Sequence, residues 1–173
     1  MRVGQCLPFK AADIWPTFGY STGTMPRSGS IRRLFALPFR DRLLLGEALA
    51  YLAFASAMVR LLPFRKLVDV AQSPLEVRAS EPVDMDRLRR AVEAWARRVP
   101  WRAVCIQCAL ALHLLLRRRG VASELHYGIR KSQDGPLSAH VWLSVDDVTL
   151  IGGEAAADHV PVATFRTGSH DGL

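Results

Sequence analysis

The sequence predicts an α+β fold in which N-terminal helices are followed by an antiparallel β-meander. Three observations predict it: helical periodicity from Pro38 to Leu67, two further helical patterns on either side of Pro100, and two strand-like segments, SELHYGIRK and SAHVWLSV. The helical patterns all precede the strand patterns, and this segregation along the chain is typical of α+β domains. The 173 residues, 50% of them apolar, are enough for one domain with its own core.

The first helical region contains a long apolar segment, residues 43–62, and has a candidate break at Pro63. This segment is nearly long enough to span a bilayer, but Glu47 and Arg60 lie within it and basic residues flank both ends. Because a charge inside a bilayer is costly, the sequence favours a buried or membrane-surface helix over a membrane span.

Two shorter helices are expected next. Asp84 can cap a helix that runs to about Arg98, because apolar residues recur along it at a spacing of three to four. Pro100 ends that helix. A second helix is expected from about Ala103 to Arg119, with Gly120 after it as the stop signal.

The strands complete the predicted domain, residues 32–165. SELHYGIRK and SAHVWLSV are joined by the turn QDGP, and a tight turn at Asp146-Asp147 leads into VTLIGG. Residues 1–31 contain three prolines and four glycines without sustained periodicity, so we expect a loop or a disordered segment. Residues 166–173 are expected to form a flexible tail.

The charge pattern argues against a nucleic-acid binder although the formal net charge is +7. Residues 27–66 hold eight basic side chains against two acids, and residues 87–131 hold eleven against two, whereas residues 134–173 hold six acids against one arginine. These basic residues alternate with Leu and Ala runs and do not form a basic stripe with interleaved aromatics. They are therefore interpreted as the solvated faces of amphipathic helices.

Cysteine usage and the N-terminus point to a cytoplasmic protein. Three cysteines, Cys6, Cys105 and Cys108, are too few and too unevenly placed for a disulfide scaffold, which favours a reducing compartment. The first residues include Arg2 and Lys10 but no apolar run of the kind found in secretory signals.

Cys105 and Cys108 lie where an apolar helix begins, and they are not equivalent. Cys105 falls in the first turn, where unpaired backbone N–H groups and the helix dipole favour a thiolate. Cys108 lies one turn deeper, on the face of Leu112 and Leu116, where a buried thiol stays neutral. Only Cys105 is therefore placed for chemistry.

Three other interpretations of the pair are open. Both cysteines could be small core residues. A thioredoxin-like redox pair also starts a helix, but that fold has a strand directly before the motif, and here an Arg-rich helix and Pro100 precede it. A zinc site needs a second ligand pair, and the histidines His113, His126, His140 and His159 lack the required spacing.

His140 is the candidate base for Cys105. It begins the strand SAHVWLSV, and a helix followed by an antiparallel meander can bring the start of such a strand against the helix N-terminus. We therefore expect the two side chains within hydrogen-bond reach. Trp142 lies two residues further and should share the strand face of His140. His113 and His126 are expected to be packing residues, and His159 to lie in a mobile tail.

The stretch PWRAVCIQCALALHLLLRRRGVASELHYGIRK, followed by LSAHVWLSVDD, resembles the leader peptidases of lasso-peptide biosynthesis. These are the microcin-processing B proteins, whose C-terminal domain is transglutaminase-like. The matching features are Pro-Trp before the cysteine, LLRRRG, the Glu-Leu-x-x-Gly-Ile-Arg strand and Ala-His-x-Trp. The resemblance implies a transglutaminase-like (papain-like) cysteine peptidase core, with Cys105 as the nucleophile and His140 as the general base.

The sequence departs from this family at the third catalytic position. The family's Asp usually lies about twelve residues after the histidine, and here that position is Gly152. With a two-residue turn at Asp146-Asp147, Glu154 is the nearest acid on the following strand, so it is the candidate third member. A backbone or other polar group, or Asp158, could instead orient the imidazole.

The resemblance implies removal of the leader segment from a ribosomally made lasso precursor, without a cofactor. Residues 1–31 are too short and too rich in Pro and Gly to form the family's leader-recognition domain. We therefore expect a separate leader-recognition protein as a partner, and a macrolactam-forming cyclase that takes the product. The alternatives are a catalytically impaired helper that only binds peptide, a thioredoxin-like redox protein, and a basic helical protein that binds nucleic acid or the membrane surface, which the net charge of +7 would suit.

Overall fold

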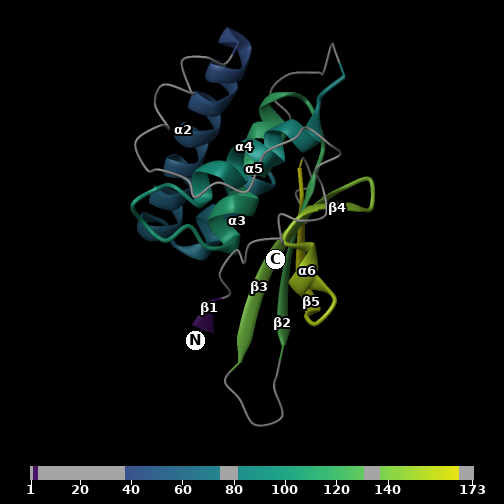
Figure 1. Cartoon of the computed structure of the whole chain (residues 1–173). Coiled ribbons are helices and arrows are strands. Elements are labelled where there is room, and N and C mark those ends of the chain that lie inside the picture. The colour runs from purple at the N-terminus through teal and green to yellow at the C-terminus, as the bar shows by residue number, and fades with distance from the viewer. Residues whose placement is uncertain (1, 4–37, 75–81, 131–136, 168–173) are drawn as a thin grey trace, which may run out of the picture.

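The computed structural model describes residues 2–3, 38–74, 82–130 and 137–167 as a layer of helices packed on a sheet (Figure 1). The helices are α2 Phe39–Leu61, α3 Phe64–Ala71, α4 Met85–Ala96, α5 Cys105–Arg118 and the short α6 Gly153–Ala156. The strands are β1 Arg2–Val3, β2 Glu124–Arg130, β3 Ser138–Val145, β4 Val148–Ile151 and β5 Val160–Arg166. This arrangement confirms the predicted α+β class.

The predicted helix boundaries agree with local signals in the structure. The first helical region breaks at Pro63, between α2 and α3. The Asp84 carboxylate accepts a hydrogen bond of 2.8 Å from the backbone N–H of Arg87 and so caps α4. Gly120 follows α5 with a φ of 72°, a left-handed conformation that ends a helix at little cost for glycine.

The sheet contains the predicted meander and two strands, β1 and β5, that the sequence did not predict. β2 pairs with β3 and β3 with β4, both antiparallel, and the β3–β4 turn has positive φ at Asp146 (47°) and Asp147 (64°). β5 then returns to pair with the other edge of β2. A flexible tail was expected for residues 166–173. This expectation is wrong at Arg166, which ends β5, and residues 168–173 lie outside the described residues.

The N-terminal segment is described only at residues 2–3. These residues form β1, which pairs in parallel with the start of β3. The expectation of loop or disorder is therefore wrong at these two positions, and for residues 4–31 it lies outside the described residues. β1 and β4 pair with β3 at the same edge, since β2 occupies the other.

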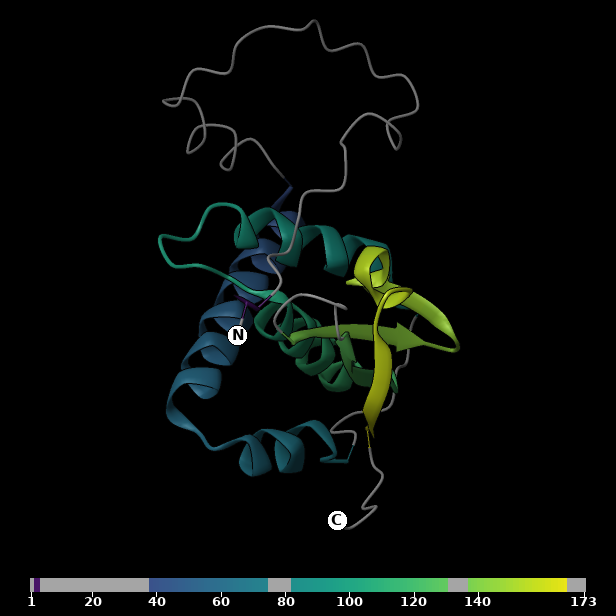
Figure 2. The same ribbon diagram turned by 90° about the horizontal axis from the view of Figure 1, so that it is seen from below.

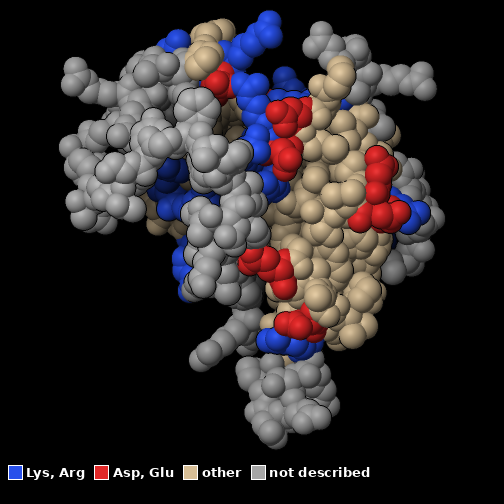
Figure 3. Space-filling view, turned by 45° about the vertical axis from the view of Figure 1, so that its right-hand side comes forward, with Lys and Arg blue, Asp and Glu red and all other residues tan. Residues whose placement is uncertain are grey.

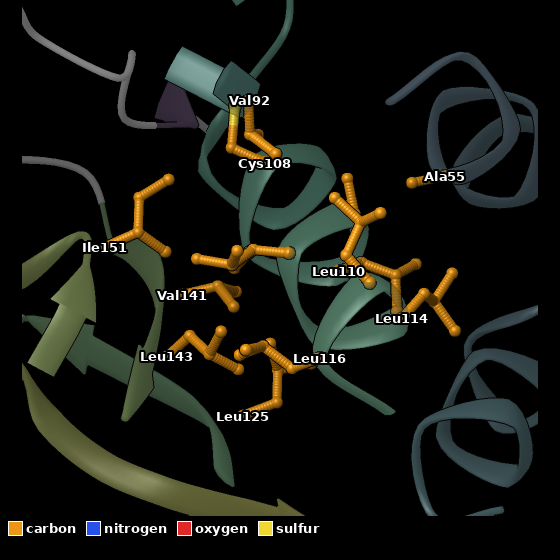
Figure 4. Packing of buried hydrophobic residues seen from close by; sticks show 14 of the residues in the cluster. Ala55, Val92, Cys108, Leu110, Leu114, Leu116, Leu125, Val141, Leu143 and Ile151 are labelled. Carbon is orange, nitrogen blue, oxygen red and sulfur yellow. The ribbon is translucent and has the colours of Figure 1, made fainter. Parts of the chain in front are cut away.

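Helix α5 is the centre of the core, and it lies between α2 and the sheet in both ribbon views (Figures 1 and 2). Leu112, Leu115 and Leu116 are fully buried, and Val141 and Leu143 of β3 point towards the helix (Figure 4). Neighbours on every side explain why α5 is almost wholly apolar, in contrast to the one-sided pattern of α4.

His113 is a packing residue of this core, as predicted. Its Nε2–H donates to the carbonyl of Ala71 (2.8 Å), and the Ser123 hydroxyl donates to its Nδ1 (2.8 Å). Burial is the main reason that the pKa of His113 lies below its ordinary value. The ring joins α5 to the end of α3 and to the residue before β2.

Candidate active site

Cys105 is the first residue of α5, and it is buried. The residue before it, Val104, has an extended backbone, and its N–H donates to Oε1 of Gln107 (3.0 Å), which stabilises the start of the helix. The first-turn position predicted for Cys105 is thus confirmed. Cys108 is fully buried and belongs to the core cluster with Val92 of α4 (Figure 4).

His140 is buried on β3, opposite Gly128 of β2. Side chains alternate along a strand, and Val141 and Leu143 point towards α5 (Figure 4). His140 and Trp142 therefore lie on the other face of β3, where their rings stack at a centroid distance of 6.2 Å. The predicted shared face of these two residues is confirmed.

His140 lies between two described pairings along one edge of β3. On this edge β1 pairs with Ser138 and Ala139, and the pairing with β4 begins at Leu143. Gly152 directly follows β4, and its carbonyl oxygen lies 2.8 Å from Nε2 of His140. The hydrogen bond thus directs the imidazole towards this edge of β3. The predicted contact of His140 with Cys105 stays a prediction.

This hydrogen bond fixes the tautomer of His140. A carbonyl oxygen only accepts, so Nε2 carries the proton in the neutral ring and Nδ1 has the free lone pair that a general base needs. Burial lowers the pKa of His140 from its ordinary value of 6.5; the Gly152 hydrogen bond opposes this shift, and the charge of His159 adds to it. The ring is therefore neutral at neutral pH.

Gly152 occupies the position at which the family resemblance predicts an Asp. Its φ is 82°, and a Cβ there would lie 2.8 Å from the carbonyl oxygen of Val141 and 3.1 Å from Nε2 of His140. The residue thus supplies its backbone carbonyl where a side chain would clash. Of the alternatives left open by the sequence, the backbone group is the one that contacts the imidazole.

The two acidic candidates lie elsewhere. Glu154 is an exposed residue in the first turn of α6, two residues beyond the carbonyl that holds His140. Asp158 is also exposed, and its carboxylate lies 3.4 Å from the guanidinium of Arg130. The geometry therefore favours Gly152 over Glu154 as the group that orients the imidazole.

His159 is a site neighbour that the sequence did not predict. It is buried next to His140, with ring centroids 5.3 Å apart, so its assignment to a mobile tail is wrong. Its Nδ1–H donates to the carbonyl of Ala155 (2.6 Å), and the Ser138 hydroxyl lies 3.4 Å from Nε2. The alternating apolar residues of VPVATFR were the available signal for an adjacent strand, and Pro161 obscured it.

Aromatic rings form a row along this face of the sheet. Trp142 stacks on His126 at 5.3 Å with an interplanar angle of 18°, and His126 accepts or donates hydrogen bonds with Thr164 and Ser144. Gly128 makes room for this row, because a Cβ there would lie 2.6 Å from the Trp142 ring. His126 is thus a packing residue, as expected, although it lines the face that carries His140.

Among the described residues, no three His, Cys, Asp or Glu side chains lie together in a way that could hold a metal ion. The face turned forward in Figure 3 shows separate acidic groups on a largely uncharged surface, with basic groups gathered to one side.

The sequence matches the family model of the transglutaminase-like superfamily over residues 48–164. This range begins within α2, ends within β5 and contains both Cys105 and His140. The chain therefore belongs to the transglutaminase-like superfamily, which includes cysteine peptidases. Searches of the curated proteins and of the solved structures gave no match.

Proposed function

We propose that this chain is a cysteine peptidase that removes the leader peptide from a ribosomally made lasso precursor. The observation that carries the proposal is the hydrogen bond from Nε2 of His140 to Gly152, which leaves Nδ1 as a base at the edge of β3. The domain is transglutaminase-like, and Cys105 begins a helix that packs against this strand. The leader-peptidase assignment itself rests on the sequence resemblance.

The proposed reaction begins with transfer of the Cys105 thiol proton to Nδ1 of His140. The thiolate attacks the carbonyl carbon of the leader–core bond, and the imidazolium returns its proton to the departing amine of the core peptide. Water then attacks the thioester and releases the leader with a free carboxylate. Backbone N–H groups of the first turn of α5 are the available donors for the developing oxyanion.

Substrate delivery and product use follow from the same proposal. A separate leader-recognition protein presents the precursor, and an ATP-dependent cyclase closes the macrolactam on the freed core. The peptidase step balances with water alone, so we propose that it uses no cofactor, and we place the protein in the cytoplasm.

A second candidate function is a non-catalytic helper that binds the precursor. Two observations favour it: glycine stands where the resemblance leads to an Asp, and His140 lies on the face of β3 turned away from α5. A redox role has less support, because Cys108 is fully buried and an α-helix and its connecting segment precede α5.

Mass spectrometry of a matching precursor, incubated with this chain and the recognition protein, tests the proposal. We expect one cut that releases the leader, loss of the cut in Cys105→Ala, and retention in the matched variant Cys108→Ala. Glu154→Gln should keep most of the activity if the Gly152 carbonyl orients His140. An unchanged precursor with wild-type protein, in a complex that still forms, would support the helper instead.

A further inference from the structure

Helix α2 presents a stripe of apolar side chains to solvent along its length. Phe39, Leu43, Phe54 and Leu61 have exposed fractions of 66%, 56%, 54% and 80%. At about 100° per residue these four positions fall within a sector of about 60°. The exposed small residues Ala50 and Ala57 lie in the same sector, and the exposed Gly46 lies about 20° outside it. The stripe is therefore continuous from one end of the helix to the other.

The two acidic residues of α2 both form ion pairs with arginines of other helices or helix ends. Asp41 forms an ion pair with Arg87 of α4. Glu47 pairs with Arg119, with 2.5 Å between Oε2 and Nη2. These pairs attach α2 to the rest of the domain. Asp41 lies far from the stripe around the helix, whereas Glu47 lies about 20° from Phe54, so the carboxylate that borders the stripe is one paired with Arg119.

Basic residues flank the stripe. Arg42 and Arg60 are exposed and share one angular position beside it, and Arg40 is exposed on its other side. Just beyond α2, Arg65 and Lys66 are exposed at the start of α3. Such side chains can lay their apolar stems along the stripe and carry their charges to the phosphates of lipid headgroups.

The opposite side of α2 is fixed in the core. Ala48, Leu52 and Ala55 are fully buried, and the Ser56 hydroxyl accepts a hydrogen bond of 3.0 Å from the Trp101 indole. The helix is long and apolar enough to cross a bilayer, but only 28% of its most apolar window is buried in the domain. This combination fits a helix that stays packed while its outer face meets an apolar surface.

We infer that α2 docks the protein on a bilayer surface that carries anionic phospholipids. Apolar side chains bordered by arginines, with both acids of the helix held in ion pairs, match acyl chains below a layer of negative headgroups. A second copy of this chain matches less well. Antiparallel pairing about Ala50 would bring Arg40 and Arg42 close to Arg60 of the other copy, and parallel pairing would align Arg42 with itself.

Flotation of the full chain with vesicles tests this inference. Vesicles of phosphatidylglycerol and phosphatidylcholine should carry the protein upward, and vesicles of phosphatidylcholine alone should bind it about ten-fold more weakly. High salt should remove most of this difference, because it screens the arginine–headgroup attraction. Absence of binding to anionic vesicles at low salt overturns the inference.

Two double variants assign the binding to the stripe and its flanks. Phe39→Gln with Leu61→Gln should lower partitioning about ten-fold, and Arg42→Gln with Arg60→Gln should remove the preference for anionic lipid. The matched control is Val148→Gln on β4, with 63% exposure, which should bind as wild type. An equal loss in the control overturns the inference. So does a wild-type dimer in sedimentation that the Phe39/Leu61 variant dissociates, because the stripe would then belong to a second copy.

Discussion

At the scale of the residue, Gly152 determines how His140 is held. Its carbonyl fixes the same tautomer that a carboxylate would fix, because either group accepts a hydrogen bond from Nε2–H. A carbonyl carries only a partial charge, however, and stabilises the imidazolium less than a carboxylate does. We therefore expect a base with the correct geometry and a smaller gain from charge stabilisation than in a Cys-His-Asp site.

Gly152→Ala should destabilise the protein and disturb the site together. A left-handed conformation costs an L-residue about 1–2 kcal/mol, and the contact with the Val141 carbonyl adds to this cost. The matched control is Gly46→Ala, where nothing lies within 4 Å of the new Cβ and the helix should gain about 0.5–1 kcal/mol. Urea unfolding measures both changes. An unchanged free energy of unfolding in Gly152→Ala would contradict the left-handed backbone at residue 152.

His113 should make the folded state sensitive to acid. Its pKa is lowered in the folded protein, mainly by burial, so between that value and the ordinary 6.5 the unfolded chain binds more protons. Stability is therefore fully present above about pH 6.5 and decreases as the pH falls. His113→Gln should have a lower Tm at pH 8 but a flatter Tm–pH profile. A profile as steep as that of wild type would show that other groups control the transition.

At the scale of the element, local signals were predictable and non-local ones were not. The break at Pro63 and the cap at Asp84 depend on neighbouring residues, so the sequence shows them. β5 depends on pairing with β2, which is distant in the sequence, and Pro161 interrupts its pattern. For the partner of His140, the sequence could predict only the kind of group, a backbone or other polar group among the alternatives. It could not predict the Gly152 carbonyl, because every residue type has a backbone carbonyl.

The central position of α5 predicts its sensitivity to truncation. Leu112→Ala removes a side chain that is fully buried between helices and sheet, so the free energy of unfolding should fall by about 2–5 kcal/mol. Leu43→Ala is the matched control on α2, where 56% exposure limits the change to about 0.5 kcal/mol. Chemical denaturation followed by circular dichroism separates the two. Equal losses would mean that α2 is covered in solution.

At the scale of the whole molecule, the described residues form one helical layer on one sheet, with the thiol at a helix start and the imidazole at a strand edge. Under the proposed function, a separate recognition protein should raise the cleavage rate substantially, because tethering the leader raises the local concentration of the scissile bond. Rates with and without that protein measure the effect. Efficient cleavage by this chain alone would contradict the proposed need for a separate recognition protein and would leave the peptidase assignment intact.

The pairing of Cys105 with His140 is the central claim, and alkylation of the thiols tests it without a known precursor. Iodoacetamide labelling near neutral pH, followed by peptide mass spectrometry, gives a separate rate for Cys105 and for Cys108. We predict much faster labelling of Cys105 in wild type, and a selective slowing at Cys105 in His140→Asn, because the variant lacks the base that accepts the thiol proton. Equal rates at the two cysteines, or a Cys105 rate unchanged by His140→Asn, would contradict the pairing.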